Sequence, residues 1–295
     1  MTMSNLEPLV SVVMPALNAA QTLDDQLEAL AHQECDEPWE LIVVDNGSSD
    51  ATAAILRRTA ERVPALRVVS CHRRGINCAR NAGVAASRGD RILLCDADDV
   101  VAPGWIRTLA AALEESELVG GTTDTTTLND RSVQHSRANP VSTGLPTALS
   151  FMTYAIGANM GFRRDVFDRI GGFDEAFTKG SDEIDFCFRA QYAGYRLEFV
   201  SEAVVHYRLR ARPSEVLRQS YGFARANTQL YAKHCELGRI PRPPVRQQWR
   251  VARRRLRSVV RVYRVAQPDQ RLAYVRNLGR ALGVVAGFAR YRMIA

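Results

Sequence analysis

Two aspartates two positions apart, in Asp96-Ala97-Asp98, are the residues of this sequence best suited to bind a metal ion. They directly follow the apolar run Ile92–Cys95, and carboxylates at the end of a buried strand are costly without a counter-ion. Mg²⁺ and Mn²⁺ prefer carboxylate and phosphate oxygens and commonly use one or two protein carboxylates. Such a cation would bridge to phosphates and stabilise the charge on a departing diphosphate. The alternative is a solvated acidic turn, which the motif alone does not exclude.

Two further segments carry side chains suited to binding a nucleotide. Asp45-Asn46-Gly47 follows another apolar run, where Asp or Asn can contact a base edge and Gly lets the backbone approach a ligand. The residues that follow also suit a helix N-cap. Gly75 opens an expected helix in which Arg80 is predicted to contact a diphosphate or to orient Asp96. A plain surface role for Arg80 fits its spacing equally well.

A general base is predicted in Asp182-Glu183-Ile184-Asp185, which places three carboxylates in four positions at a helix start. A carboxylate there can deprotonate a hydroxyl group that attacks a substrate. Acidic residues at a helix start are also favoured by the helix dipole, so a structural role competes with this hypothesis. His206 follows an apolar strand, and it becomes a candidate metal ligand if the end of that strand faces Asp98.

Strands and helices alternate over the first hundred residues, which must position these side chains. Apolar, β-branched runs predict strands, and 3–4 spacing predicts helices; the strands are expected at 9–14, 40–44, 66–70 and 91–95, and the helices at 22–31, 52–62 and 76–87. This alternation favours a parallel sheet with helices on both faces. Because ligands of such sheets bind at the carboxyl ends of the strands, the loops after residues 14, 44 and 95 are expected to face one site.

The pattern loosens after Gly120. Residues 122–150 predict strand plus loop, and 157–162 predict a short buried segment. A helical turn is expected over 164–170 and a helix over 182–194, followed by two short strands at 197–200 and 203–207. The rest of the chain is helical in character.

Charge divides the chain into an acidic front and a basic tail. Residues 207–295 contain 20 Arg and 1 Lys against 3 acidic residues, a net charge of +18, whereas residues 1–206 carry 18 basic and 29 acidic residues, or −11. Within the tail, Trp249–Val265 has an apolar stripe flanked by arginines, which predicts a basic amphipathic helix. It suits either adsorption to an anionic membrane surface or packing on the domain or on a second subunit of a homo-oligomer.

Composition favours a cytoplasmic protein, and adsorption through the basic tail would place it on the inner face of the cell membrane. The six cysteines include no C-x-x-C pair, which favours reduced thiols over a disulfide framework. The N-terminus lacks the features of a signal peptide, and no run of about 18 apolar residues predicts a membrane span.

Taken together, the motifs resemble those of the family 2 inverting glycosyltransferases with the GT-A fold. The resemblance covers about residues 9–208 and rests on six segments in the expected order: Val12–Asn18, Val43–Asp50, Ala79–Gly83, Leu94–Asp99, Gly171–Glu175 and Asp182–Ala190. It implies a GT-A-type, Rossmann-like mixed sheet flanked by helices over residues 1–208, with a basic, mainly helical C-terminal region over 209–295.

The resemblance also implies roles for particular residues. Asp98 would bind Mn²⁺ or Mg²⁺, Asp96 would contact the ribose or the metal, and His206 would complete the metal shell. Glu183 would be the catalytic base. The residues assigned to the nucleotide-sugar donor are Pro15, Ala16, Asn18, Asp45, Asn46, Gly75, Arg80, Asp96 and Ala97.

Two departures from the family pattern bear on these roles. The acidic pair is Asp182-Glu183 where the family often has Glu-Asp or Asp-Asp, so Asp182 stays a candidate base. The Q-x-x-R-W motif of processive polysaccharide synthases is missing, which favours transfer of a single sugar to a hydroxyl acceptor.

Two other classes of protein compete with this interpretation. A nucleotidyltransferase would need a Gly-rich, Lys- or Arg-bearing phosphate loop after the first strand, and Pro15–Gln21 has neither feature. A nucleic-acid-binding protein acting through its basic tail leaves the acidic front and its ordered motifs unexplained. A glycosyltransferase acting in the synthesis of a cell-envelope glycan, a glycolipid or a related glycoconjugate is therefore the preferred prediction.

Overall fold

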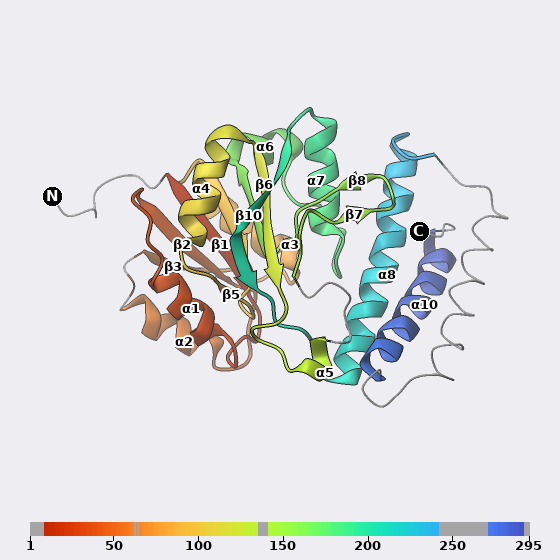
Figure 1. Cartoon of the computed structure of the whole chain (residues 1–295), viewed down its shortest axis with the longest axis horizontal. Helices are drawn as coiled ribbons and strands as arrows, with labels where there is room; N and C mark the ends of the chain where they lie inside the picture. The colour runs from red at the N-terminus through yellow and green to blue at the C-terminus, as the bar shows by residue number, and fades with distance from the viewer. Residues whose placement is uncertain (1–8, 62, 64, 135–140, 242–270, 292–295) are drawn as a thin grey trace.

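The structure, a computed structural model, describes residues 9–291 apart from 62, 64, 135–140 and 242–270. Its centre is a mixed eight-stranded sheet in the order β3-β2-β1-β4-β9-β6-β10-β5. Helices flank the sheet, and the C-terminal helices α8 and α10 lie side by side at one end of the molecule (Figure 1).

The first half of the chain forms the parallel part of this sheet, which confirms the predicted alternation. The strands are β1 (Val10–Ala16), β2 (Trp39–Asp45), β3 (Leu66–Ser70) and β4 (Arg91–Cys95). The helices between them are α1 (Leu23–Ala31), α2 (Thr52–Ala60) and α3 (Ile76–Ala86). As expected, β1, β2 and β4 end at the same edge of the sheet, which is called the carboxyl edge below.

The second half adds strands in both directions. β9 (Asn159–Arg163) runs antiparallel between β4 and β6 (Leu118–Asp124), β10 (Leu197–His206) is parallel to β6, and the short β5 (Val100–Val101) closes the sheet. The helices are α4 (Trp105–Glu115), α5 (Arg131–Gln134), α6 (Arg164–Ile170) and α7 (Asp182–Tyr192), and β7 (Thr147–Ala148) pairs with β8 (Met152–Thr153) in a separate ribbon. By this topology β6 and β10 also end at the carboxyl edge.

One sequence prediction about these strands was wrong. Residues 197–200 and 203–207 were expected to form two strands, but they belong to the single strand β10, whose register on β6 shifts between Val200 and Val204. The intervening residues remain bonded, because Thr122 Oγ1 donates to the Ser201 carbonyl and Asn159 Nδ2 donates to the Ala203 carbonyl. Side chains from β6 and β9 thus hold a bulge in β10, at a position where the local sequence predicts a break between two strands.

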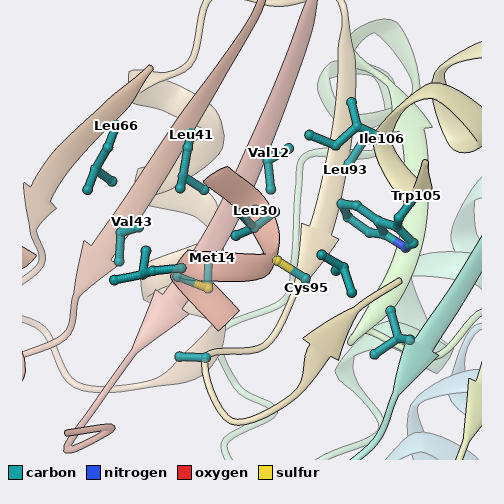
Figure 2. Packing of buried hydrophobic residues seen from close by; sticks show 14 of the residues in the cluster. Val12, Met14, Leu30, Leu41, Val43, Leu66, Leu93, Cys95, Trp105 and Ile106 are labelled. Atoms are coloured by element: carbon teal, nitrogen blue, oxygen red, sulfur yellow. The ribbon is translucent and has the colours of Figure 1, made fainter. Parts of the chain in front are cut away.

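Buried side chains pack on both faces of the sheet. Alternate residues of β1 point to opposite faces, so that Val12 and Met14 pack beneath α1 and α4 while Val13 packs beneath α3. Figure 2 shows the first cluster, in which Trp105 and Ile106 of α4 lie beside the strands. These two cores fix the sheet against which the carboxyl edge is built.

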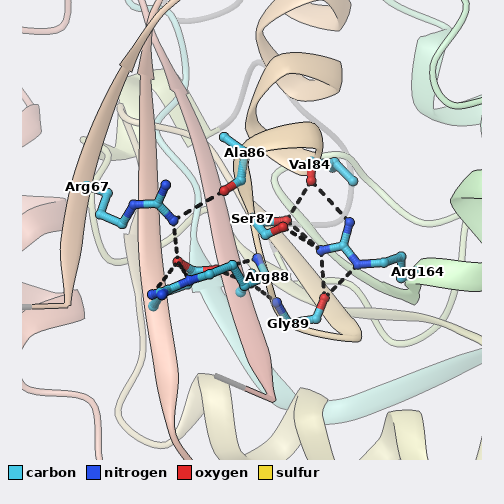
Figure 3. Close-up of polar contacts among 9 residues, drawn as sticks. Arg67, Val84, Ala86, Ser87, Arg88, Gly89 and Arg164 are labelled. Carbon is cyan, nitrogen blue, oxygen red and sulfur yellow. Dashed lines mark hydrogen bonds and ion pairs between the residues drawn. The ribbon is translucent and has the colours of Figure 1, made fainter. Parts of the chain in front are cut away.

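A polar network closes the opposite, amino edge of the sheet. Glu40 is 3% exposed, and its carboxylate accepts hydrogen bonds from the Ser11 hydroxyl, the Arg88 backbone N–H and the Arg67 guanidinium. Nearby, Arg164 donates to backbone carbonyls at the end of α3, including that of Gly89 (Figure 3). The charged groups of this edge therefore have partners.

The C-terminal region contains α8 (Pro213–Glu236) and α10 (Arg271–Tyr291), which run in the same direction. Gly279, Gly283 and Gly287 of α10 face α8, and a Cβ at Gly279 would lie 2.7 Å from the Leu217 carbonyl oxygen. Glycine thus allows close backbone contact. Among the described helices, none is long and apolar enough to span a bilayer. The amphipathic helix predicted at 249–265 lies outside the described residues.

Candidate active site

Asp96, Asp98 and Asp99 form an acidic group at the carboxyl edge, directly after β4. One oxygen from each carboxylate lies within 4.8 Å of the others. The backbone beneath them is held by α1 and the residue before it. Gln26 Nε2 of α1 donates to the Asp96 carbonyl at 3.1 Å, and Thr22 Oγ1 donates to the Ala97 carbonyl at 3.1 Å. Ala97, predicted at the donor site, thus lies in the middle of this group.

Asp99 is the member that the sequence did not single out. It is 1% exposed; its Oδ1 accepts the Arg208 backbone N–H at 2.7 Å, while its buried Oδ2 has no hydrogen-bond partner. Burial, together with the charges of Asp98 and Asp96, raises the pKa of Asp99 well above its usual range. Burial also raises the pKa of Asp96. A buried orphan carboxylate oxygen beside two more carboxylates fits a divalent cation, which would supply the missing positive charge.

Arg80 of α3 joins the acidic group to the start of α7. Arg80 is 2% exposed, and its guanidinium pairs with both Asp182 and Asp96, the latter at 3.4 Å. Gly157 lies against this guanidinium, where a Cβ would clash with it. The predicted contact between Arg80 and Asp96 is therefore present, and the alternative of a plain surface arginine was wrong.

Glu183 follows the residue that Arg80 binds. Its side chain is partly buried at the first turn of α7. Burial, reinforced by the charge of Asp182, raises the pKa of Glu183 to about 8, although Arg80 acts in the opposite direction. A carboxylate whose pKa lies near the operating pH is a strong proton acceptor, so this side chain has the electrostatics of a general base.

Helix α7 is anchored to the C-terminal region through Asp185. This carboxylate is 0% exposed and pairs with Arg189 at 2.7 Å, with Lys233 at 2.6 Å and with His234 at 3.1 Å. Burial works to raise its pKa, but His234, Arg189 and Lys233 outweigh it and set the pKa of Asp185 to about 2. Lys233 and His234 come from α8, so residues of the tail help to hold the helix that carries Glu183.

His206, predicted as a metal ligand, ends β10 opposite Val100 of β5. It is not part of the described acidic group formed by Asp96, Asp98 and Asp99. Its Nδ1 lies 2.9 Å from Oδ2 of Asp124 at the end of β6. Burial would raise the pKa of Asp124, but hydrogen bonds from Thr126 and Thr127 bring it far below its usual range. With Nδ1 engaged, Nε2 is the ring nitrogen left to bind a metal, and that role stays a prediction.

The residues after β1 and β2 that were predicted to bind the nucleotide-sugar donor lie in two adjacent loops. Asn18 has a φ of 51°, and its Oδ1 accepts the Ser49 N–H at 2.8 Å. Asp45 Oδ1 accepts the Ser48 N–H at 2.9 Å. The bond between Asn18 and Ser49, together with the Asn18 N–H donated to Ser48 Oγ at 3.0 Å, joins the loop after β1 to the loop after β2, as the alternation predicted. The bond between Asp45 and Ser48 lies within the second loop.

Asn46 was predicted to bind the nucleotide-sugar donor, but its side chain already makes three hydrogen bonds within the protein. Its amide donates to the Cys71 and Arg73 carbonyls and accepts the Gly75 N–H at 2.8 Å. In the structure it holds the chain that leads into α3, and direct contact with a base stays a prediction. Pro15 and Ala16 lie in β1, where the Ala16 carbonyl accepts the N–H of Asn46.

The segment between β10 and α8 crosses the acidic group. Arg208 Nε donates to the Asp98 carbonyl at 2.9 Å, and its Nη2 pairs with Asp25 at 3.0 Å. Arg210 pairs with Asp98 Oδ2 at 2.7 Å. Arg208 and Arg210 have no distinguishing signal in the sequence, because only the fold brings the start of the tail to the residues after β4.

Three aspartates at the carboxyl edge of a mixed sheet, with a carboxylate of raised pKa at the start of α7, agree with the glycosyltransferase resemblance of the sequence. The family model for glycosyl transferase family 2 matches residues 11–171. The chain belongs to this family, and it is an enzyme of the glycosyltransferase class.

Curated relatives agree with this assignment. Glycosyltransferase AglE of Haloferax volcanii is 26% identical over 260 residues, which cover 82% of this chain and 84% of AglE. Succinoglycan biosynthesis protein ExoO of Rhizobium meliloti is 31% identical over 194 residues, which cover 60% of this chain and 54% of ExoO. The match thus spans most of AglE but about half of ExoO.

Two solved structures share the fold. Mannosyltransferase PcManGT of Pyrobaculum calidifontis, in complex with GDP-Man and Mn²⁺, aligns with 97% of this chain and 75% of its own at a TM-score of 0.59 and 22% identity. Residues 1–349 of S. aureus TarS, in complex with UDP-GlcNAc, align with 98% of this chain, which covers 93% of that segment, at a TM-score of 0.55 and 17% identity.

Proposed function

We propose that this protein transfers one sugar from a nucleotide-diphosphate donor to an acceptor hydroxyl, with inversion at the anomeric carbon and with Mn²⁺ or Mg²⁺ bound. The observation that carries the proposal is Arg80, whose guanidinium pairs with Asp96 on one side and Asp182 on the other. It ties the candidate metal site to the start of α7, where the neighbouring residue Glu183 is the proposed base, and a metal site and a base are the two halves that such a reaction needs.

The metal would be held by Asp98 and Asp96, with Asp99 beneath them and His206 Nε2 as a further ligand. The orphan oxygen of Asp99 and the mutual proximity of the three carboxylates support the carboxylate part of this ligand set. When bound, the cation supplies positive charge to the diphosphate as it leaves. The Mn²⁺ in the PcManGT complex is consistent with such a cation in a protein of the same fold.

Glu183 is the better candidate for the base. Asp182 is 2% exposed and its carboxylate is engaged by Arg80, which leaves it poorly placed to receive a proton. The Glu183 carboxylate would remove the proton from the acceptor hydroxyl while that oxygen bonds to the anomeric carbon. The bond from this carbon to the diphosphate oxygen then breaks on the opposite face. The proton ends on Glu183, and the nucleoside diphosphate leaves with the electron pair.

A two-stage experiment tests the proposed function. A thermal-shift screen of UDP-, GDP- and dTDP-sugars with Mn²⁺ should raise the melting temperature for one donor, because a ligand that binds only the native state stabilises it. The anomeric configuration of the product formed from that donor, measured by NMR, should be opposite to the donor's. Retention of configuration would contradict the inverting step, and a donor stabilisation that EDTA leaves intact would contradict the metal.

Cell-envelope or related glycoconjugate synthesis is the proposed setting, since ExoO is named for the biosynthesis of succinoglycan. The missing Q-x-x-R-W motif supports addition of a single sugar. Mass spectrometry of the product should give one sugar per acceptor, and a ladder of products would contradict single transfer.

Attachment to an anionic membrane surface through the tail is part of the proposal. In α10, Leu282 and Val285 are 47% and 51% exposed, and the helix contains arginines and no acidic residue. Apolar side chains beside arginines suit an interface rich in anionic lipids. The double variant Leu282→Asp/Val285→Asp should sediment less with phosphatidylserine vesicles than wild type. Leu237→Asp, at an exposed apolar position outside α10, is the matched control. Equal sedimentation of all three proteins would contradict membrane attachment.

A further inference from the structure

Three arginines surround the acidic group, and they differ in how firmly they are held. The Arg80 side chain is 3% exposed and bridges two carboxylates. Arg208 is 28% exposed and is bonded both to the Asp98 carbonyl and to Asp25. Arg210 is 45% exposed, and its ion pair is with Asp98. The last of these guanidinium groups is therefore the one that can move without unpacking the site.

Arg210 occupies the carboxylate that the proposed function assigns to the metal. Its Nη2 lies 2.7 Å from Asp98 Oδ2, which is the length of a strong charge-assisted hydrogen bond. A divalent cation bound directly to that carboxylate and a guanidinium at the same oxygen would repel each other. The three carboxylates lie within 4.8 Å of one another, so the site needs positive charge whether or not a metal is present.

We propose that Arg210 is an exchangeable cation of the active site. While no metal is bound, its guanidinium neutralises Asp98. When a divalent cation takes Asp98, the released guanidinium would pair with the diphosphate of the donor instead. This inference rests on the proposed function, because it takes Asp98 as the metal ligand. A planar guanidinium suits the second role, since its fork matches phosphate oxygens.

The exchange predicts that Arg210→Gln changes the affinity for Mn²⁺ and the affinity for the nucleotide in opposite directions. Metal binding in wild type must first break the ion pair, and an ion pair at this exposure changes affinity by about two- to fivefold. The variant should therefore bind Mn²⁺ alone about two- to fivefold more tightly. In the presence of saturating Mn²⁺ it should bind UDP or GDP about tenfold more weakly, because a hydrogen bond to a charged phosphate is lost.

Titration calorimetry of the full-length protein measures both affinities. Asp98→Asn defines the part of Mn²⁺ binding that depends on this carboxylate. Arg210→Lys keeps the positive charge but not the fork, so its affinity for Mn²⁺ should stay close to that of wild type. Arg212→Gln is the matched control, because Arg212 is 78% exposed and lies 3.9 Å from Glu215 rather than at the acidic group. Neither affinity should change in this control.

The outcomes separate the exchange from the function on which it rests. Unchanged or weaker Mn²⁺ binding by Arg210→Gln would overturn the exchange, and so would unchanged nucleotide binding. Wild-type protein that bound no Mn²⁺ through Asp98 would overturn the metal site together with the exchange. Mn²⁺ binding that needs Asp98 but is indifferent to Arg210 would leave the proposed function standing and the exchange wrong.

Discussion

Glu40 and Asp99 are both carboxylates buried at an edge of the same sheet, yet their surroundings are opposite. At the amino edge, Glu40 accepts hydrogen bonds from Ser11, Arg88 and Arg67. Burial works to raise its pKa, but these partners outweigh burial and hold the pKa below its ordinary value. At the carboxyl edge, Asp99 leaves one oxygen without a partner, and burial raises its pKa well above the usual range.

Glu40, which is paired, therefore stabilises the fold, whereas Asp99, with one unpaired oxygen, costs the fold free energy. A buried charge costs free energy unless it is paired, so an unpaired one persists where a ligand can supply the partner. The two edges can therefore be told apart experimentally. A substitution at the amino edge should change stability, and a substitution at the carboxyl edge should change catalysis and metal binding.

The largest expected effect comes from Glu183→Gln at the carboxyl edge. Loss of the base should lower the rate of sugar transfer by about 10²- to 10⁴-fold, since Gln cannot accept the proton. Donor binding, measured by calorimetry, should stay close to that of wild type. Glu198→Gln, at a side chain that is 42% exposed, is the control and should keep full activity. Transfer at the wild-type rate would assign the base to another residue.

Glu40→Gln, at the amino edge, should change stability rather than catalysis. Removing the charge leaves Arg67 and Arg88 without their shared partner, which should lower the free energy of unfolding by about 2–4 kcal/mol. Because the folded-state pKa of Glu40 is lowered, its contribution is present above its unfolded-state pKa and is lost as pH falls. Denaturation in urea at pH 7 and at acidic pH measures both effects.

The control for this variant is Asp24→Asn, which breaks the exposed ion pair between Asp24 and Arg58. It should change stability by less than about 1 kcal/mol. If Glu40→Gln were no more destabilising than Asp24→Asn, the amino edge would not be the stabilising region.

Transfer activity should rise with pH if Glu183 is the base. With a pKa of about 8, the carboxylate form is the minority at neutral pH and the majority above pH 8, so kcat/KM should increase by about tenfold between pH 7 and 9. Initial rates should be normalised to the folded fraction measured by circular dichroism at each pH. A rate that is already maximal at pH 6 would contradict the raised pKa.

The smallest effect is expected from Asp99→Asn in the absence of metal. An amide can donate to the neighbouring carboxylates instead of repelling them, so the free energy of unfolding should increase by about 1 kcal/mol. Asp168→Asn, at an exposed position of α6, should leave stability unchanged. A destabilised Asp99→Asn variant would remove the distinction between the two edges, since Asp99 would then behave like Glu40.

Local sequence was enough to predict the parallel strands and the polar loops at their carboxyl ends. The strand before Asp96 and the loops after β1 and β2 follow from apolar runs and polar stops, and parallel strands bring their ends to one edge. Two strands were predicted at 197–200 and 203–207 in place of the single strand β10, because the bulge in β10 depends on Thr122 and Asn159, which belong to other strands.

Other parts of the site required contacts across the chain. Nothing near Asp99 in the sequence indicates that one of its oxygens is buried without a partner. Asp185 reads as part of an acidic helix start, and its pairing with Lys233 and His234 appears only when α8 packs on α7. In the same way, the Asn46 side chain is of a type that can bind a ligand, but its amide donates hydrogen bonds to the Cys71 and Arg73 carbonyls.

The segment 207–212 gives the enzyme a thermodynamic link between its tail and its chemistry. One end of it bonds to Asp99 and Asp98 through Arg208, and the other leads directly into α8. A ligand of the tail that favours one arrangement of this segment would change the affinity for metal by some factor. By reciprocity, metal must then change the affinity of the tail for that ligand by the same factor. A surface that recruits the enzyme through its tail would in that case also tune its occupancy by metal.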